Sequence, residues 1–153
     1  MFVHLAFFDW LERVLYSKVL KRICLTFRTG YVPGEMIGYM IEIDNQSNRD
    51  MRSSKLSLIK HVTYVTRKKN KYVSRIIAQT KHGRVSAGDS DLWEGVVMKI
   101  PAVPPTNLAG VCNVIKVRYT LELCVVPNGP AFDLEVQLPV TIGTVPLKVL
   151  FTN

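Results

Sequence analysis

The side chains best suited to chemistry in this sequence are three histidines and three cysteines, and their spacing decides what they could do. They are His4, His61, His82, Cys24, Cys112 and Cys124. No two cysteines form a Cys-x-x-Cys pair, and the histidines show no ligand spacing, which is the main sequence signal for a zinc site. The sequence therefore predicts no metal site. The scattered cysteines are interpreted as small buried apolar side chains of a reducing compartment.

Carboxylates and glycines give no stronger indication of catalysis. Asp89 and Asp91 lie close together in the 86–91 segment. Acid–base catalysis needs a pocket and perturbed pKa values, however, and loop carboxylates are usually solvated. His61 and His82 have no nucleophile motif beside them, and the glycines form no phosphate-cradling pattern. We expect a protein that is not an enzyme and that needs no cofactor.

A basic cluster is the best candidate for a binding site. The formal net charge of +8 and the pI near 9.6 favour attraction to phosphate on lipid or nucleic acid. The cluster consists of Arg67, Lys68, Lys69, Lys71, Arg75, Lys81 and Arg84. If residues 67–71 are a hairpin turn, these side chains gather at one end of the domain. There they either bind an anionic membrane surface or a partner, or only solvate the hairpin. Nucleic acid is disfavoured, because base stacking needs exposed aromatic side chains and only Tyr64 and Tyr72 flank the cluster.

Strands must position these residues, because apolar and polar side chains alternate with a period of two through most of the chain. The expected strands are 23–28, 36–44, 55–66, 72–81, 92–100, 111–126 and 132–140. The 55–66 strand has mixed faces, which indicates a change of side through a bulge. About seven strands without a convincing helix between them predict the all-β class, as an antiparallel immunoglobulin-like β-sandwich. We expect this domain to span residues 22–150.

Residues 1–21 break the alternation and form a separate apolar segment. On a helix, one arc would carry Leu5, Phe8, Leu11, Leu15 and Val19. Phe7, Trp10 and Val14 fall outside that arc, so a helix here would be apolar around much of its circumference. We expect a short helical or irregular segment. It either packs on the sandwich or a partner domain, rests at a membrane interface, or is not native to the fold.

The same segment bears on location. No apolar run reaches the roughly 18 residues needed to cross a bilayer. No positively charged region precedes the apolar N-terminus, so a secretory signal is not expected. We therefore expect a cytoplasmic protein.

Six short motifs occur in order along the chain. They are 30–35 (GYVPGE), 42–45 (EIDN), 93–95 (WEG), 99–105 (KIPAVPP), 117–121 (VRYTL) and 138–144 (LPVTIGT). Together they resemble the C-terminal domain of the arrestin family, in its arrestin domain-containing (alpha-arrestin) branch, from about Arg22 to Leu147. The resemblance implies structural roles for the motif residues Pro33, Gly34, Glu35, Asn45, Trp93, Pro101, Pro104 and Gly143.

The resemblance implies a protein-binding adaptor of intracellular protein transport, located in the cytoplasm or at endosomal or plasma membrane surfaces. Such a protein binds cytoplasmic parts of membrane cargo or sorting adaptors and so biases endocytosis or endosomal sorting. Family members carry two sandwiches in tandem, so a single one is expected to pair with another arrestin domain or to self-associate through uncovered strand edges. The alternative is a basic β-sandwich that docks on anionic lipid or nucleic acid without an adaptor role.

Two departures from the family pattern limit what is carried over. The only Pro-Pro pair, Pro104–Pro105, is followed by Thr106 and Asn107, so no Pro-Pro-x-Tyr motif is present. Ubiquitin ligase recruitment by that route is therefore doubtful. Ser47 stands where the thioredoxin-binding member of the family has a cysteine, so disulfide exchange with thioredoxin is not expected.

Overall fold

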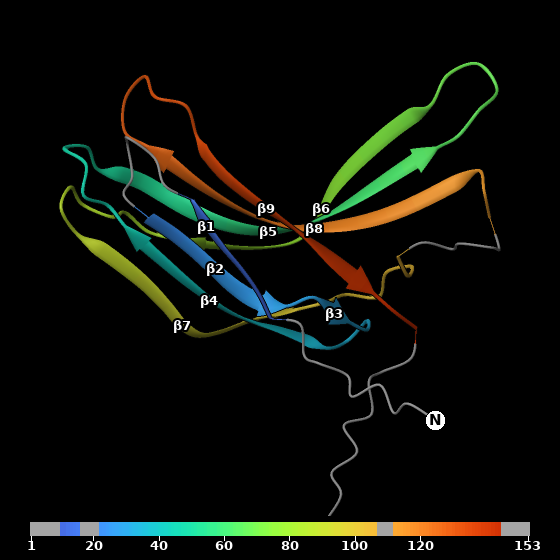
Figure 1. Cartoon of the computed structure of the whole chain (residues 1–153), viewed down its shortest axis with the longest axis horizontal. Helices are drawn as coiled ribbons and strands as arrows, with labels where there is room; N and C mark the ends of the chain where they lie inside the picture. The colour runs from blue at the N-terminus through green and yellow to red at the C-terminus, as the bar shows by residue number, and fades with distance from the viewer. Residues whose placement is uncertain (1–9, 16–21, 107–111, 145–153) are drawn as a thin grey trace, which may run out of the picture.

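The computed structural model describes residues 10–15, 22–106 and 112–144, which form two β-sheets stacked face to face (Figure 1). The four-stranded sheet has the order β1-β2-β4-β7, with β1 at Trp10–Leu15, β2 at Arg22–Arg28, β4 at Met36–Asp44 and β7 at Ser90–Lys99. The five-stranded sheet has the order β3-β9-β8-β5-β6, with β3 at Gly30–Tyr31, β9 at Leu134–Ile142, β8 at Ile115–Pro127, β5 at Met51–Tyr64 and β6 at Lys71–His82.

The predicted all-β sandwich is confirmed. All strand pairs are antiparallel except β3 with β9, which run parallel over a two-residue register. The described residues contain nine strands rather than about seven, and the two that the sequence did not predict are β1 and the short β3. The bulge expected in the 55–66 strand lies instead on the neighbouring strand, because Leu58 pairs with Ala78 and Ile59 with Ile76, which leaves Ile77 of β6 as the extra residue.

The N-terminal segment corrects the helical prediction. Trp10–Leu15 is strand β1, and all six of its residues pair antiparallel with β2, from Trp10 opposite Arg28 to Leu15 opposite Ile23. Residues 1–9 and 16–21 lie outside the described part of the chain. The physical reason is tertiary: an edge strand offers a row of backbone partners, and these override a weak local helical pattern.

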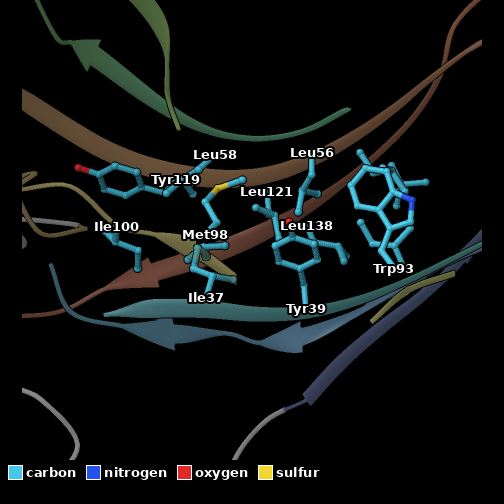
Figure 2. Close-up of a cluster of buried hydrophobic side chains, with 14 of the residues drawn as sticks. Ile37, Tyr39, Leu56, Leu58, Trp93, Met98, Ile100, Tyr119, Leu121 and Leu138 are labelled. Atoms are coloured by element: carbon cyan, nitrogen blue, oxygen red, sulfur yellow. The ribbon is translucent and has the colours of Figure 1, made fainter. Parts of the chain in front are cut away.

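The core lies between the two sheets and explains the alternation seen in the sequence. Figure 2 shows Ile37 and Tyr39 of β4 facing Leu121 of β8 and Leu138 of β9, with Met98 between them. In β4 the burial alternates strictly, so that Ile37, Tyr39, Ile41 and Ile43 are buried while their neighbours face outward. Alternating burial of this kind fixes the register, since a one-residue slip would turn the whole apolar set toward solvent.

Candidate functional site

The basic cluster centres on the β5–β6 hairpin. Tyr64 at the end of β5 pairs with Lys71 at the start of β6, so residues 65–70 form the connecting loop. Inside this loop the Lys69 amide donates to Thr66 Oγ1 at 3.1 Å, and the Thr66 hydroxyl donates to the Lys69 carbonyl. The predicted hairpin is therefore present. Figure 1 shows its tip, with the start of β8 beside it, extending away from β1, β2, β4 and β7.

The structure brings together only part of the predicted cluster. Arg67, Lys68 and Lys69 lie in the loop, Lys71 begins β6, and Arg75 follows on the same strand, all exposed. Lys81 lies opposite Lys55 near the other end of the hairpin. At about 3.3 Å per residue, Lys81 is roughly 33 Å along the strand from Lys71. The prediction that all seven gather at one end is therefore wrong for Lys81 and Arg84, because Lys81 lies near the far end of β6 and Arg84 lies beyond that end.

Arg84 belongs to a separate ion pair. Its guanidinium contacts the Asp50 carboxylate, which also accepts a hydrogen bond from the Ala87 amide at 2.8 Å. The Ala87 amide, and then Arg84, lower the pKa of Asp50 below its ordinary value. Because its charge is already paired, Arg84 is less available to an external anion than the residues of the hairpin loop.

One face of the hairpin carries a shallow depression of about 400 Å³. Its lining alternates cations and apolar side chains on both strands, and consists of Lys60, Val62, Tyr64, Lys71, Val73 and Arg75. The register places Lys60 opposite Arg75, Val62 opposite Val73 and Tyr64 opposite Lys71. In the described part of the chain, no carboxylate lies within ion-pairing distance of Lys60, Lys71 or Arg75.

Lys60 is the residue of this face that sequence reasoning missed. The signal was present as two alternating triplets, Lys60-x-Val62-x-Tyr64 and Lys71-x-Val73-x-Arg75. In a hairpin, alternation on both strands puts the two triplets on one face. The clustering of positive charge near 67–71 hid this pattern, because it drew attention to the loop rather than to the face.

The backbone of β6 is also available. β6 is the outermost strand of its sheet, and β5 is its only pairing partner among the described residues. On the side opposite the depression, Tyr72 is 70% exposed and Ile76 is 57% exposed. An edge strand of this kind presents unpaired N–H and C=O groups that another extended segment can pair with.

The Pro33–Gly34 turn joins the two halves of the fold. Gly34 has φ of +90°, a conformation that side chains with a Cβ resist, and its amide donates to the Ile100 carbonyl at 2.9 Å. Glu35 Oε2 accepts from the Val32 amide and from Arg28 Nη2, each at 2.9 Å. Gly34 and Glu35 therefore have a structural role here, since their hydrogen bonds hold the turn against the end of β7.

Asn45 holds two chain segments together. It is fully buried, and its Nδ2 donates to the carbonyl oxygens of Arg49 at 2.8 Å, Ser86 at 3.0 Å and Val85 at 3.3 Å. Its Oδ1 accepts from the Ser47 hydroxyl at 2.6 Å. One side chain thus holds the β4–β5 connection against the loop that leads into β7.

Trp93 and His82 close the corner between the two sheets. Trp93 is 1% exposed, and its Nε1 donates to Asp91 Oδ2 at 2.8 Å. His82 Nδ1 lies 2.7 Å from the same oxygen, and its ring centroid is 4.4 Å from that of Trp93. The Asp91 carboxylate is therefore a structural acceptor shared by β6 and β7, rather than one of a pair of catalytic acids with Asp89.

The remaining motif residues anchor the end of β9. The Gly143 amide donates to the Tyr31 carbonyl at 2.8 Å, and the Thr106 amide donates to the Ile142 carbonyl at 2.7 Å. In the segment that follows Pro101, the Pro104 carbonyl accepts from the Tyr119 hydroxyl at 2.5 Å. Burial raises the pKa of Tyr119 to about 12, so this hydroxyl remains a donor at neutral pH.

Four apolar side chains are exposed on the outer face of β4 and β7. Met36 and Met40 of β4 are 52% and 46% exposed, and Leu92 and Val97 of β7 are 52% and 55% exposed. Val97 lies opposite Gly38, which has no side chain, so the stripe has a shallow centre. We call these four residues the outer stripe. Charged residues border the stripe, because Leu92 lies opposite Glu42 and Met36 opposite Lys99.

Cys124 is a buried thiol with a hydrogen-bonding carboxylate nearby, Asp133 Oδ2 at 3.8 Å from its sulfur. Burial, followed by the nearby Asp133 carboxylate, raises the pKa of Cys124 to about 11, so its thiol stays protonated at neutral pH. Within residues 10–15, 22–106 and 112–144, no three His, Cys, Asp or Glu side chains are grouped to hold a metal ion. The described part likewise contains no helix with the length and apolar character needed to cross a membrane.

The sequence matches one protein family over most of its length. Residues 25–147 match the family model described as arrestin (or S-antigen), C-terminal domain. The chain is 35% identical over 119 residues to arrestin domain-containing protein 4 of Mus musculus, an alignment that covers 78% of this chain and 28% of that protein. It is 34% identical over 119 residues to the Homo sapiens protein of the same name, with the same coverage.

A second relative agrees. The chain is 30% identical over 116 residues to arrestin domain-containing protein 1 of Rattus norvegicus, covering 76% of this chain and 25% of the relative. The chain thus spans about a quarter of the length of the curated relatives that it matches. The resemblance drawn from the six motifs is confirmed.

Proposed function

This chain belongs to the arrestin family, whose C-terminal domain it carries, and we propose from this premise that it is a protein-binding adaptor of intracellular protein transport. It holds cytoplasmic segments of membrane cargo, or of sorting adaptors, and so biases endocytosis or endosomal sorting. The action is binding without covalent chemistry. The observation that carries the proposal is the β5–β6 hairpin, where cations without an ion-pair partner and a strand edge without a pairing strand, both among the described residues, lie together.

The hairpin supplies a physical reason for work at a cytoplasmic membrane surface. Each basic group near an anionic leaflet contributes about 1 kcal/mol, so several together hold a domain there weakly and reversibly. Arg67, Lys68, Lys69 and Lys71 lie at the exposed tip, where they can approach a membrane together. Weak attraction of this kind raises the local concentration of the domain near membrane cargo without replacing the protein contact that gives specificity.

A vesicle experiment tests the membrane part. Replacing Lys68, Lys69 and Lys71 by Ser should weaken binding to phosphatidylserine vesicles at low salt by about 100-fold, since three contributions of roughly 1 kcal/mol are lost. The matched control replaces three exposed cations that lie outside the 65–71 tip of the hairpin, in the variant Arg49→Ser, Arg52→Ser, Lys99→Ser. Equal loss in both variants would mean that net charge, rather than the hairpin, governs membrane attraction.

Proximity labelling in cells tests the adaptor role itself. The chain, the hairpin variant and the control variant are each fused to a labelling enzyme and compared. Enrichment of transmembrane cargo and endosomal sorting proteins by the chain is the expected result. If the chain labels only proteins that reside on anionic membranes or on nucleic acid, and no cargo or sorting proteins, the alternative function is favoured. In that alternative a basic sandwich docks on polyanions and has no adaptor role.

The outer stripe favours a second kind of partner. We propose that Met36, Met40, Leu92 and Val97 pack against another arrestin domain or a second copy of this chain. Relatives several times longer than the chain leave room for such a domain. Met40→Glu with Val97→Glu should abolish any concentration-dependent association in sedimentation velocity. A profile that is monomeric for the unchanged chain at every concentration would argue against self-association.

A further inference from the structure

We propose that the open edge of β6 binds an extended acidic segment of a partner protein as an added strand, with the pattern acidic–x–apolar–x–acidic. This inference rests on the adaptor function above and names the kind of segment that the hairpin would take. It commits to a protein segment rather than to a lipid headgroup. Three observations carry it: the free edge, the alternation of charge on one face, and the length over which the strand is regular.

The free edge supplies the backbone part of the interaction. In the order β3-β9-β8-β5-β6, the outward side of β6 has no described partner strand. The register with β5 is regular from Lys71 to Ile76 and shifts next to Ile77. A partner strand can therefore pair continuously with about five or six residues before the irregularity, which matches the short segments that add to sheet edges.

The alternation of charge supplies the specificity. Residues directly opposite each other on neighbouring strands point to the same face of a sheet. A strand paired with β6 therefore places every second side chain beside Lys71, Val73 and Arg75, over the depression described above. Carboxylates opposite Lys71 and Arg75, with an apolar side chain opposite Val73, complement this face.

A like-charge contact strengthens the argument. Lys60 and Arg75 are directly opposite each other on β5 and β6, and no carboxylate separates them within the described residues. Like charges in this arrangement destabilise a sheet. A carboxylate placed opposite Arg75 lies beside this pair and relieves the repulsion.

The proposed pattern does not depend on strand direction. Acidic–x–apolar–x–acidic reads the same from either end, so parallel and antiparallel addition present the same side chains to the depression. The x positions fall on the other face, beside Tyr72, Ser74 and Ile76. Because Tyr72 and Ile76 are exposed there, β-branched residues suit the x positions.

An NMR titration with synthetic peptides tests the proposal. The probe is the peptide GTDTVTDTG, and the matched control is GTTDVDTTG, which has the same composition but places both acidic residues on the other face. We expect the probe to shift the amide signals of residues 71–76 and to bind about tenfold more tightly than the control, since two cross-strand charge pairs are involved.

Charge reversal on the protein gives the second arm. Lys71→Glu with Arg75→Glu should weaken binding of the probe by at least about tenfold and should bind GTKTVTKTG instead, because the pairs are re-formed with opposite sign. Lys68→Glu with Lys69→Glu changes the net charge equally but leaves the face intact, and should keep probe affinity within about twofold. All four positions are exposed, so the exchanges do not disturb the core.

Three results would overturn the proposal. They are equal binding of probe and control peptides, equal loss in the two charge variants, and probe-induced shifts confined to the 65–70 loop. Any of these would mean attraction by net charge without strand addition. Their effect on the adaptor function is separate: if proximity labelling still enriches cargo while the peptides fail, then only the β6 site is wrong.

Discussion

Asn45 offers the sharpest test of how the fold is held together. The side chain is 0% exposed and joins two segments, with Nδ2 directed at the carbonyl oxygens of Arg49, Val85 and Ser86, and Oδ1 accepting from Ser47. Replacing Asn45 by Ala leaves those carbonyl groups without their shared donor. Replacing it by Asp keeps an acceptor for Ser47 but directs a carboxylate oxygen at the carbonyl groups.

The magnitudes follow from this geometry. Three of the contacts, at 2.6, 2.8 and 3.0 Å, are short enough to count as full hydrogen bonds. Losing about 1 kcal/mol for each predicts that Asn45→Ala lowers the free energy of unfolding by about 3 kcal/mol. Asn45→Asp should cost more at neutral pH, because a buried charge facing carbonyl oxygens is repelled. Ser47→Ala removes one of these bonds and also the acceptor of the Arg49 amide at 3.2 Å, at a half-buried position, and should cost about 1–2 kcal/mol.

Urea unfolding followed by tryptophan fluorescence measures all three variants. The same environment that disfavours the introduced carboxylate raises the pKa of its carboxyl group above the unfolded value, so Asn45→Asp should recover stability as the pH is lowered, when the protonated group becomes a donor. Asn45→Ala provides the matched control without this dependence. The reasoning fails if Asn45→Ala costs no more than Ser47→Ala, or if the two Asn45 variants have the same stability at neutral pH.

Three further predictions concern the hydrogen-bonded carboxylates Asp50 and Glu35 and the buried thiol of Cys124. The lowered pKa of Asp50 means that its contribution to stability is present above the unfolded pKa and is lost as the pH falls through the folded one. The urea midpoints of the chain and of Asp50→Asn should therefore differ at pH 7 and converge only as the pH falls below the folded pKa of Asp50; a constant difference would contradict this. Glu35→Ala removes the acceptor of Arg28 and Val32 and should cost about 1–3 kcal/mol in unfolding, whereas Glu35→Gln should cost less because it keeps an acceptor oxygen. Cys124, with a pKa of about 11, should resist iodoacetamide at pH 8 in the folded protein and react once urea unfolds it, as peptide mass spectrometry can check; rapid native alkylation would refute this.

Strict alternation made most of the fold predictable. Residues 36–44 and 134–142 alternate in sequence and alternate in burial, because each strand faces the core with one side only. β1 could not be predicted in this way, since its partner is the edge of β2 rather than a local pattern. The two-residue β3 is too short to carry any periodicity, and it exists because Gly30 and Tyr31 pair with the end of β9.

The candidate site was predictable in composition but not in extent. Charge runs along the sequence showed the tip of the hairpin, because loop residues that are adjacent in sequence remain adjacent in space. Lys60 belongs to the site because it lies opposite Arg75 on the neighbouring strand. Such proximity depends on the pairing register and not on distance along the sequence. Lys81 and Arg84 do not belong to the site, because the extended strand β6 carries them away from the hairpin tip. If the predicted hairpin is used to assign which residues lie opposite each other, the two alternating triplets fall on one face. The bulge at Ile77 shifts the pairing by one residue, so the assignment holds only between the loop and that bulge.

The contrast between paired and unpaired polar groups separates scaffold from binding surface. The motif residues Glu35 and Asn45, together with Asp91, have side-chain partners within the domain, so they stabilise the fold itself. Lys60 and Arg75 instead face each other as like charges, an arrangement that costs stability in isolation. That cost is offset only when an anion is present, whether from a partner segment or a membrane. The stability of the chain should therefore rise on adding the acidic probe peptide. The Lys71→Glu, Arg75→Glu variant should be more stable alone, since its second exchange places a carboxylate opposite Lys60, and it should gain nothing from that peptide.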